Sequence, residues 1–486
     1  MSVAALYDAE DATGLAAAVG RGDVSPSELL EEALARAEAL NPALNALTML
    51  RPETARAAIA AGPPAGPLRG VPFLLKDLGG EAADFPANNG SRLLADTRYP
   101  VDSALVARLR AAGLVVFGRT TAPEGGVGPV TESAVYGGPT RNPWDLARTP
   151  GGSSGGAGAA VAAGIVPAAH ASDGGGSIRI PASNCGLFGF KTTRARAPDG
   201  PYAGEGWAGM AIEGFLTRSA RDQAALLDAV CGPDLGAPYW PPPMEGTFLD
   251  AIRTRPRGLR VAFHDDAPSG APIHPDCARA VRETAALLER LGHRVEEARP
   301  QADLDGLMAA WTRIVACGTT LWVRQALAKR ARPLRPDDLE PAAHAALRMA
   351  AGLGGADYLE AVETVHAFGR ATAAFFEGFD MLLTATLAEP PALVGRFAHS
   401  AVDDFAAYRT GPEGVFAYSP FTVAANASGQ PAASLPLGTS AEGLPVGVQI
   451  AARFGADAAL MALCAQIEEA APWAQRRPQL FGRTAP

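Results

Sequence analysis

Two glycine- and serine-rich runs hold the residues best suited to chemistry. They read Gly-Gly-Ser-Ser-Gly-Gly at 151–156 and Ser-Asp-Gly-Gly-Gly-Ser-Ile-Arg at 172–179. Consecutive glycines allow backbone conformations and close approaches that other residues do not. The N–H groups of Gly174, Gly175, Gly176 and Ser177 could therefore converge on one point, as an oxyanion hole requires. Ser177 would then lie beside this hole as a candidate nucleophile.

A lysine and an ion pair are expected to support these runs. The chain has only three lysines, and Lys76 stands at the end of the apolar segment 66–77, which reads as a short buried strand between turn residues. Arginine holds its proton too tightly to act as a base, whereas a desolvated lysine can lose it. Asp173 and Arg179 flank the second run, where we expect them to brace the loop by charge-assisted hydrogen bonds.

Other interpretations of the glycine runs are weaker. A phosphate-binding loop would need a Lys-Ser or Lys-Thr ending, which neither run has. Residues 151–155 match the G-x-S-x-G elbow, but an elbow serine needs a histidine base. None of the seven histidines lies in a motif-like setting; His170 is in an apolar run and His399 in a predicted loop. A histidine-dependent site is therefore not expected.

The remaining composition narrows the class of protein. The 486 residues are 48% apolar and 19% charged, as in a soluble globular protein, and the net charge of -9 comes without basic clusters. Neither nucleic acid nor a membrane is an expected partner. Five cysteines without CxxC spacing, and no His/Cys/Asp cluster with ligand spacing, predict no disulfide framework, metal or cofactor. With no signal-peptide pattern at the amino terminus, a cytoplasmic location is expected.

The elements that would position these residues alternate between strands and helices. A capping box at 25–28 predicts a helix that ends near 41–42, and a helix at 104–112 is followed by a strand at 114–117. The charge-free segment 149–172 contains glycines and Pro167, and we interpret it as a buried loop followed by a helix at 157–163. Further strands are expected at 259–263, 381–383 and 446–450, further helices at 278–291 and before Trp473, and mostly helix from 304 to 376. We predict an α/β fold with one domain over 1–486 and a helical subregion over the site at about 300–410.

Together these blocks resemble the signature of the amidase signature family. The resemblance covers nearly the whole chain and is weakest from about 200 to 410. Besides the two glycine runs, it rests on Gly-Val-Pro at 70–72, Lys-Asp at 76–77, Thr-Arg-Asn-Pro-Trp-Asp at 140–145, Gly-Gln-Pro-Ala-Ala-Ser-Leu-Pro at 429–436 and Gly-Leu-Pro-Val-Gly-Val-Gln at 443–449.

The resemblance implies a large mixed β-sheet sandwiched by helices and a Ser-Ser-Lys triad. It implies that Ser177 is the nucleophile, Ser153 the bridging serine on a cis peptide bond and Lys76 the base. It also implies an oxyanion hole from Gly174 to Ser177 and a hydrogen bond from Ser154 within the triad network.

Details of the loops give expectations about the substrate. Gly174 and the small residues at 125–128 suggest a roomy acyl site bordered by Gly126 and Val127. The sequence at 171–177 resembles the branch of the family that includes 6-aminohexanoate cyclic-dimer hydrolase and related amide- or carbamate-cleaving enzymes. In that branch Cys317 would face the substrate; the alternative is a buried structural cysteine.

The expected function is a serine hydrolase that cleaves carboxamides through an acyl-enzyme, with carbamates and esters as further candidates. Its partner would be a small-molecule substrate, and the chain would be a monomer or a homodimer. Two alternatives remain. One is a glutamine amidotransferase subunit for tRNA charging, and the other is a catalytically silent interaction protein on the same fold.

Overall fold

A single mixed β-sheet of eleven strands forms the frame of the molecule in a computed structural model, which describes residues 2–267, 270 and 272–483. The strand order is β1-β3-β2-β4-β6-β5-β10-β11-β9-β7-β8. The strands are β1 (Leu47–Thr48), β2 (Pro72–Lys76), β3 (Val115–Thr120), β4 (Ala168–Asp173), β5 (Phe188–Lys191), β6 (Ile212–Thr217), β7 (Arg260–Phe263), β8 (Arg294–Glu297), β9 (Met381–Ala385), β10 (Ala432–Thr439) and β11 (Pro445–Ala452).

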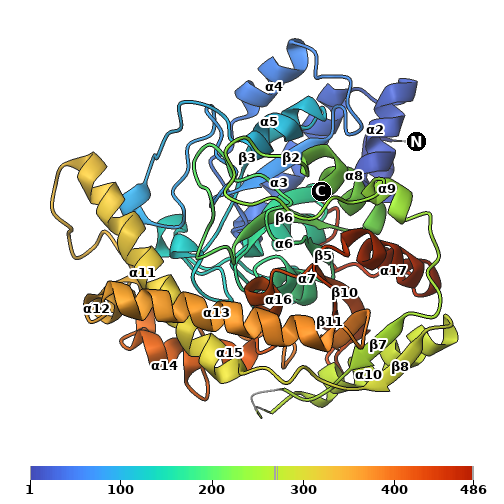
Figure 1. The fold of residues 1–486 in the computed structure, drawn as a ribbon. Coiled ribbons are helices and arrows are strands. Elements are labelled where there is room, and N and C mark those ends of the chain that lie inside the picture. The colour runs from blue at the N-terminus through green and yellow to red at the C-terminus, as the bar shows by residue number, and fades with distance from the viewer. Residues whose placement is uncertain (1, 268–269, 271, 484–486) are drawn as a thin grey trace.

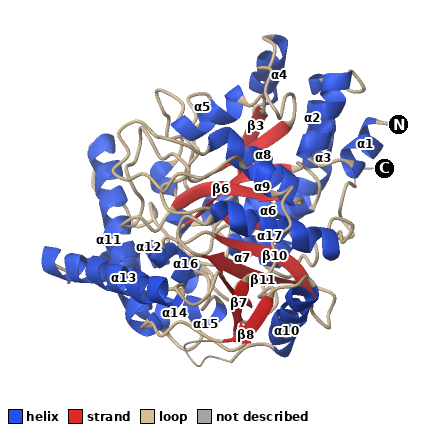
Figure 2. Cartoon of the chain, turned by 45° about the vertical axis from the view of Figure 1, so that its right-hand side comes forward, coloured by secondary structure: helices blue, strands red, loops and turns tan. Residues whose placement is uncertain are grey.

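Helices surround this sheet, as Figure 2 shows. They are α1 (Val3–Ala9), α2 (Ala12–Arg21), α3 (Pro26–Leu44), α4 (Pro52–Ala60), α5 (Ala104–Ala111), α6 (Gly155–Ala162), α7 (Arg179–Cys185), α8 (Ala220–Val230), α9 (Phe248–Ala251), α10 (Pro275–Arg290), α11 (Leu304–Arg330), α12 (Pro341–Ala351), α13 (Gly355–Phe375), α14 (Phe405–Thr410), α15 (Val415–Tyr418), α16 (Val423–Ser428) and α17 (Asp457–Ala470), with short 3-10 turns at η1 (Arg92–Leu94), η2 (Glu124–Gly126), η3 (Ala134–Tyr136) and η4 (His399–Ala401). The expected α/β fold with a large mixed sheet is confirmed.

The direction of two neighbouring strands explains where the chemistry gathers. β2 pairs in parallel with both β3 and β4, while β4 runs antiparallel to β6. Parallel strands bring their carboxyl ends to the same edge of a sheet. Lys76 is the last residue of β2 and Asp173 the last of β4. The second glycine run therefore leaves the sheet beside the lysine.

The early helix begins as predicted but ends later. Ser25 caps α3 and forms a capping box with Glu28. The expected end near 41–42 is wrong, because α3 continues through Pro42 to Leu44 and stops at Asn45, which adopts a left-handed conformation. Proline lacks one backbone N–H donor, so near the end of a long helix it removes only one of the many backbone hydrogen bonds within the helix. Asn41 then accepts from the N–H groups that follow the helix, at 2.8 Å each.

The range 300–410, expected as a helical subregion, contains α11, α12, α13 and α14 but also strand β9 of the main sheet. Figure 1 shows these helices gathered on one side of the molecule, away from α2 and α8. α11 packs against both α12 and α13. Their apolar side chains, including Trp311 and Phe405, form a cluster separate from the main core, and Phe416 of α15 joins it. These helices thus have an apolar core of their own next to the sheet.

Several strands lack a clear sequence periodicity and were not predicted. They are β1, β4, β5, β6, β8 and β10; the segment 149–172 is interpreted from the sequence as loop and helix only, although α6 is followed there by β4. β10 contains Ala-Ala-Ser-Leu-Pro-Leu-Gly-Thr and is mostly buried on both faces. A strand buried on both faces shows no polar–apolar alternation. Among the described residues, no helix has the length and apolar character needed to span a bilayer.

Candidate active site

Lys76 lies fully buried at the carboxyl end of β2, and its amine contacts two serine hydroxyls. Nζ is 2.8 Å from Ser153 Oγ and 2.9 Å from Ser172 Oγ. Burial lowers the pKa of Lys76 to about 7, although the carboxylates of Glu213 and Asp173 oppose part of this effect. In a large fraction of molecules the Lys76 amine is therefore neutral near pH 7, and the lone pair of a neutral amine can accept a proton.

Behind Lys76, a buried histidine connects its backbone to a carboxylate. The Lys76 N–H donates to His170 Nδ1 at 3.1 Å, and His170 Nε2 lies 2.6 Å from Glu213 Oε2. Burial lowers the pKa of His170 to about 3, with help from the positive charges of Lys76 and Arg119, so the ring is neutral. Because Nδ1 accepts, the single ring proton is on Nε2 and is donated to Glu213. His170 therefore positions the backbone of the lysine and does not act as a base at this site.

The first glycine run holds Ser153 in contact with the lysine. The peptide bond between Gly152 and Ser153 is cis. Thr131 fixes the run, because its hydroxyl donates to Gly151 O and accepts from Gly155 N–H, at 3.0 and 3.1 Å. Ser154 Oγ contacts the backbone of Ser172, 3.2 Å from its carbonyl oxygen and 3.3 Å from its nitrogen. Ser154 thus approaches Lys76 only through the main chain of Ser172, and no hydrogen bond joins its hydroxyl to Lys76 among the described residues.

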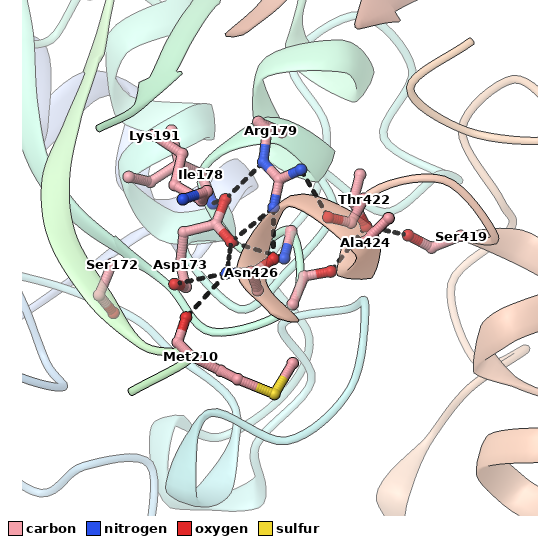
Figure 3. Close-up of polar contacts among 12 residues, drawn as sticks. Ser172, Asp173, Ile178, Arg179, Lys191, Met210, Ser419, Thr422, Ala424 and Asn426 are labelled. Carbon is pink, nitrogen blue, oxygen red and sulfur yellow. Dashed lines mark hydrogen bonds and ion pairs between the residues drawn. The ribbon is translucent and has the colours of Figure 1, made fainter. Parts of the chain in front are cut away.

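A buried ion pair braces the second glycine run. Arg179 donates from Nε and Nη2 to the two carboxylate oxygens of Asp173, at 2.9 Å each. Its other donors reach Thr422 O, Gln449 Oε1 and Asn426 Oδ1 at 2.6–2.7 Å, and Figure 3 shows Arg179 and Asn426 converging on Asp173. Burial alone would raise the pKa of Asp173, but the Arg179 charge and these hydrogen bonds hold the pKa of that carboxyl well below its usual range. Asp173 therefore stays ionised as a fixed acceptor.

The N–H groups of this loop are not all available for an oxyanion. Gly176 donates its N–H to Asp173 Oδ1 at 2.7 Å, and Ile178 donates to Oδ2 at 3.1 Å. The expectation that Gly176 contributes a donor therefore disagrees with this geometry, in which Asp173 occupies that N–H. Gly176 instead has φ +133, and a Cβ there would lie 2.4 Å from Thr422 Oγ1. Gly174, Gly175 and Ser177 remain as the candidate donors.

Ser177 lines a cavity that the helical subregion closes. The cavity has a volume of about 30 Å³, room for about two water molecules. Its lining consists of Gly126, Val127, Gly128, Pro129, Gly175, Ser177, Ile180, Trp207, Trp311, Arg409, Val415, Phe416 and Ser419. The wall also reaches Ser153, because a Cβ on Gly126 would lie 3.5 Å from Ser153 Oγ. Ser177 thus lines the cavity itself, and Ser153 lies behind its Gly126 wall.

The expected roomy site is not present, because tryptophan rings fill the space beside the glycines. A Cβ on Gly174 would lie 2.5 Å from the Trp207 ring, and one on Gly175 would lie 1.8 Å from the Trp311 ring. The two rings meet edge to face, 6.2 Å apart. The small residues therefore admit bulky side chains from elsewhere in the chain.

Of the residues suggested for substrate contact, two line the cavity and one does not. Gly126 and Val127 form part of its wall. Cys317 lies on α11 outside the lining, and burial and the charge of Asp357 on α13 raise the pKa of its thiol. Its neighbour Gly318 faces Trp207 instead, since a Cβ on that glycine would lie 2.9 Å from the ring.

Four residues that shape this site were not selected from the sequence. They are Ser172, His170, Glu213 and Arg409. Glu213 carried a usable signal, since it is an acidic residue within the otherwise apolar strand β6. Ser172 stands out in the sequence only as a residue of the second glycine run, and Arg409 lies in the segment where the family resemblance is weakest.

The large mixed sheet, with buried serine and lysine side chains at its edge, is the arrangement that this chain shares with a known class of α/β enzymes that cleave amide bonds. The sequence profile of the family described as Amidase matches residues 28–461. A 6-aminohexanoate-cyclic-dimer hydrolase of Paenarthrobacter ureafaciens is 38% identical over 483 residues, covering 97% of each chain. This protein belongs to the amidase signature family.

Solved structures of proteins from this family resemble the chain in fold, and their TM-scores differ. The structure of 6-aminohexanoate cyclic dimer hydrolase complexed with substrate matches with a TM-score of 0.92 at 37% identity, covering 98% of this chain and 99% of that one. A glutamyl-tRNA(Gln) amidotransferase subunit of Thermotoga maritima matches with a TM-score of 0.72 at 27% identity, covering 92% of each chain.

Proposed function

We propose that this protein hydrolyses small-molecule carboxamides through an acyl-enzyme on Ser177, with Ser153 and Lys76 moving the proton. The observation that carries the proposal is the buried 2.8 Å contact between Lys76 Nζ and Ser153 Oγ, next to the cavity that Ser177 lines. A lysine whose pKa is lowered by burial, in contact with a hydroxyl, is suited to act as a general base.

The proton path follows from the number of donors on the amine. A neutral lysine has two N–H bonds and one lone pair. One N–H is donated to Ser172 Oγ, so the lone pair can face Ser153 Oγ and accept its proton. Ser153 in turn takes the proton of Ser177, whose oxygen attacks the acyl carbon. The N–H groups of Gly174, Gly175 and Ser177 stabilise the charge on the acyl oxygen.

The remaining steps return the proton and release the products. The proton passes back through Ser153 to the leaving nitrogen, and the C–N bond breaks to give an amine and an acyl-Ser177 ester. Water then attacks this ester, delivers its proton along the same path, and releases a carboxylic acid. Lys76, Ser153 and Ser177 end in their starting protonation states.

The comparisons favour a small amide as the substrate. The relatives' names include hydrolysis of the cyclic dimer of 6-aminohexanoate and acylamidase activity, at 34–38% identity. Carbamates and esters also have a carbonyl carbon that a serine oxygen can attack, and they remain further candidate substrates. The amidotransferase alternative has less support, because that solved subunit is both less identical and less similar in shape.

The test is turnover by purified protein against aliphatic amides, anilides, cyclic oligoamides, carbamates and glutamine. We expect the natural chain to release amine from at least one amide, and Ser177→Ala and Lys76→Ala to release none. Circular dichroism and thermal unfolding check that both variants are folded. Full turnover by folded Ser177→Ala would refute the assignment of the nucleophile. Turnover of glutamine alone, and only with an added partner protein, would favour the amidotransferase.

A further inference from the structure

A buried arginine lines the same cavity as Ser177. Arg409 lies on α14 (Phe405–Thr410), which packs against α11, and its side chain is only 2% exposed. Burial lowers its pKa to about 10, so the guanidinium is charged at neutral pH. The substrate cavity therefore has a cationic group in its wall.

This charge has no counter-ion among the described residues. The other fully buried arginines have acceptors: Arg36 contacts Asp8 and Glu32, and Arg179 contacts Asp173. Arg119 forms no ion pair among the described residues, but its donors reach the backbone carbonyl oxygens of Lys76, Gly79, Gly80 and Phe85. Among the residues that the structure describes, Arg409 forms a single hydrogen bond, from Nε to Thr312 Oγ1 at 3.2 Å, and no carboxylate lies close enough to act on its pKa. Within the described part of the chain its Nη2 has no acceptor. Burying a charge without a partner costs free energy, and binding of an anion would offset part of that cost for Arg409.

Aromatic rings hold the guanidinium in place without giving it an acceptor. Its central carbon lies 4.4 Å from the Trp311 ring, 5.1 Å from Phe416 and 5.6 Å from Phe405. Such cation–π contacts offset part of the cost of burial and fix the plane of the fork. Trp311 Nε1–H is likewise buried and has no acceptor among the described residues. Two unsatisfied donors thus stand in the cavity wall beside the candidate nucleophile.

We propose that Arg409 binds a carboxylate on the substrate, so that the preferred amides are those of small molecules with an anionic end. This inference rests on the proposed amidase function and adds the class of substrate. Arg409 is a substrate-binding residue that makes no contact with the reacting bond. The carboxylate can belong to the acyl part, as in a monoamide of a dicarboxylic acid, or to the amine part, as in an N-acyl amino acid. In either case the planar fork and a carboxylate match as a pair of parallel hydrogen bonds.

Two pairs of substrates separate these sources. For the acyl side, the mono-4-nitroanilide of glutaric acid is compared with pentanoic 4-nitroanilide, which has a methyl group in place of the carboxylate. For the amine side, N-pentanoyl-6-aminohexanoate is compared with N-hexylpentanamide. We expect kcat/KM for at least one carboxylate to exceed that of its neutral counterpart by about tenfold or more, since hydrogen bonds between charged groups are among the strongest in proteins.

Three variants assign the preference to Arg409. In Arg409→Gln the preference should fall to about unity, and circular dichroism with thermal unfolding checks that this variant is folded. Arg409→Lys keeps the positive charge but lacks the planar guanidinium fork, and it should retain part of the preference for the carboxylate substrate. Arg313→Gln is the matched control, because Arg313 is on α11 at the surface with Glu360, 3.3 Å away, and its loss changes the net charge equally. The inference is wrong if neither carboxylate is preferred, or if the preference survives Arg409→Gln.

A binding measurement tests Arg409 even if no amide is hydrolysed. Calorimetry should detect glutarate binding to the natural chain and to Ser177→Ala, with at least about tenfold weaker binding to Arg409→Gln or Arg409→Lys. Equal binding to all four proteins, or none to the natural chain, would overturn the inference. Hydrolysis of no amide together with Arg409-dependent glutarate binding would refute the proposed function and leave the carboxylate site standing.

Discussion

The hydroxyl of Ser172 should control how the amine of Lys76 is oriented. Lys76 Nζ lies 2.9 Å from Ser172 Oγ and 2.8 Å from Ser153 Oγ, all within the buried site. If one N–H is donated to Ser172, the lone pair is directed at Ser153. Ser172→Ala removes that acceptor without touching Ser153 or Ser177. We therefore predict a slower reaction in a folded protein.

The magnitude follows from leaving a buried donor unpaired. Loss of one partner of a buried hydrogen bond costs about 1–3 kcal/mol. If the whole cost falls on the transition state, kcat/KM should decrease by about 5- to 150-fold. Ser172→Thr keeps a hydroxyl at the same place and should restore most of the rate.

The assay is amide turnover over a range of pH, with thermal unfolding to check the fold. Ser183→Ala is the matched control, because the hydroxyl of this buried serine accepts from Gly447 N–H at 2.9 Å and does not contact Lys76. We expect the control to keep the natural rate. A rate for Ser172→Ala within about twofold of the natural chain, or failure of Ser172→Thr to recover while folded, would refute the role of Ser172.

Two further predictions concern charge at the site. Only neutral Lys76 can accept a proton, and burial lowers its pKa to about 7, so kcat/KM should rise with pH through about pH 7. The Glu213 carboxylate raises the pKa of Lys76, so Glu213→Gln should move this rise in kcat/KM to lower pH. A shift of the rise to higher pH would contradict the mechanism. Arg179→Met leaves Asp173 buried without its partner and should lower the free energy of unfolding by about 3–5 kcal/mol in urea titrations, and a loss below about 1 kcal/mol would show that the ion pair is not the main brace.

Local signals were enough to predict several elements and the triad candidates. The capping box at the start of α3 and the apolar burst that ends in Lys76 are encoded in adjacent residues, and both are present in the structure. The glycine runs likewise indicated tight loops, since few other residues fit such backbones. In these cases the physical cause lies within a few residues of the chain.

Contacts between distant segments could not be predicted in this way. Glu213 meets His170 only because β6 pairs antiparallel with β4, and Ser172 meets Lys76 only because β4 lies parallel to β2. The glycines were interpreted as free space, whereas the structure fills that space with Trp207 and Trp311. A sequence shows which residues are small, but not which side chains pack against them.

The sequence by itself determined the family, the α/β class and the short runs that carry Lys76, Ser153 and Ser177, because these depend on local backbone chemistry and on blocks of neighbouring residues. Only the tertiary structure decided which donors of the glycine loop are free, how small the cavity is, and that Arg409 stands in its wall with no counter-ion among the described residues. Hydrogen-bond partners, cavity volume and charge compensation all arise from segments that are far apart in the chain and meet only when the sheet and the helical subregion pack together.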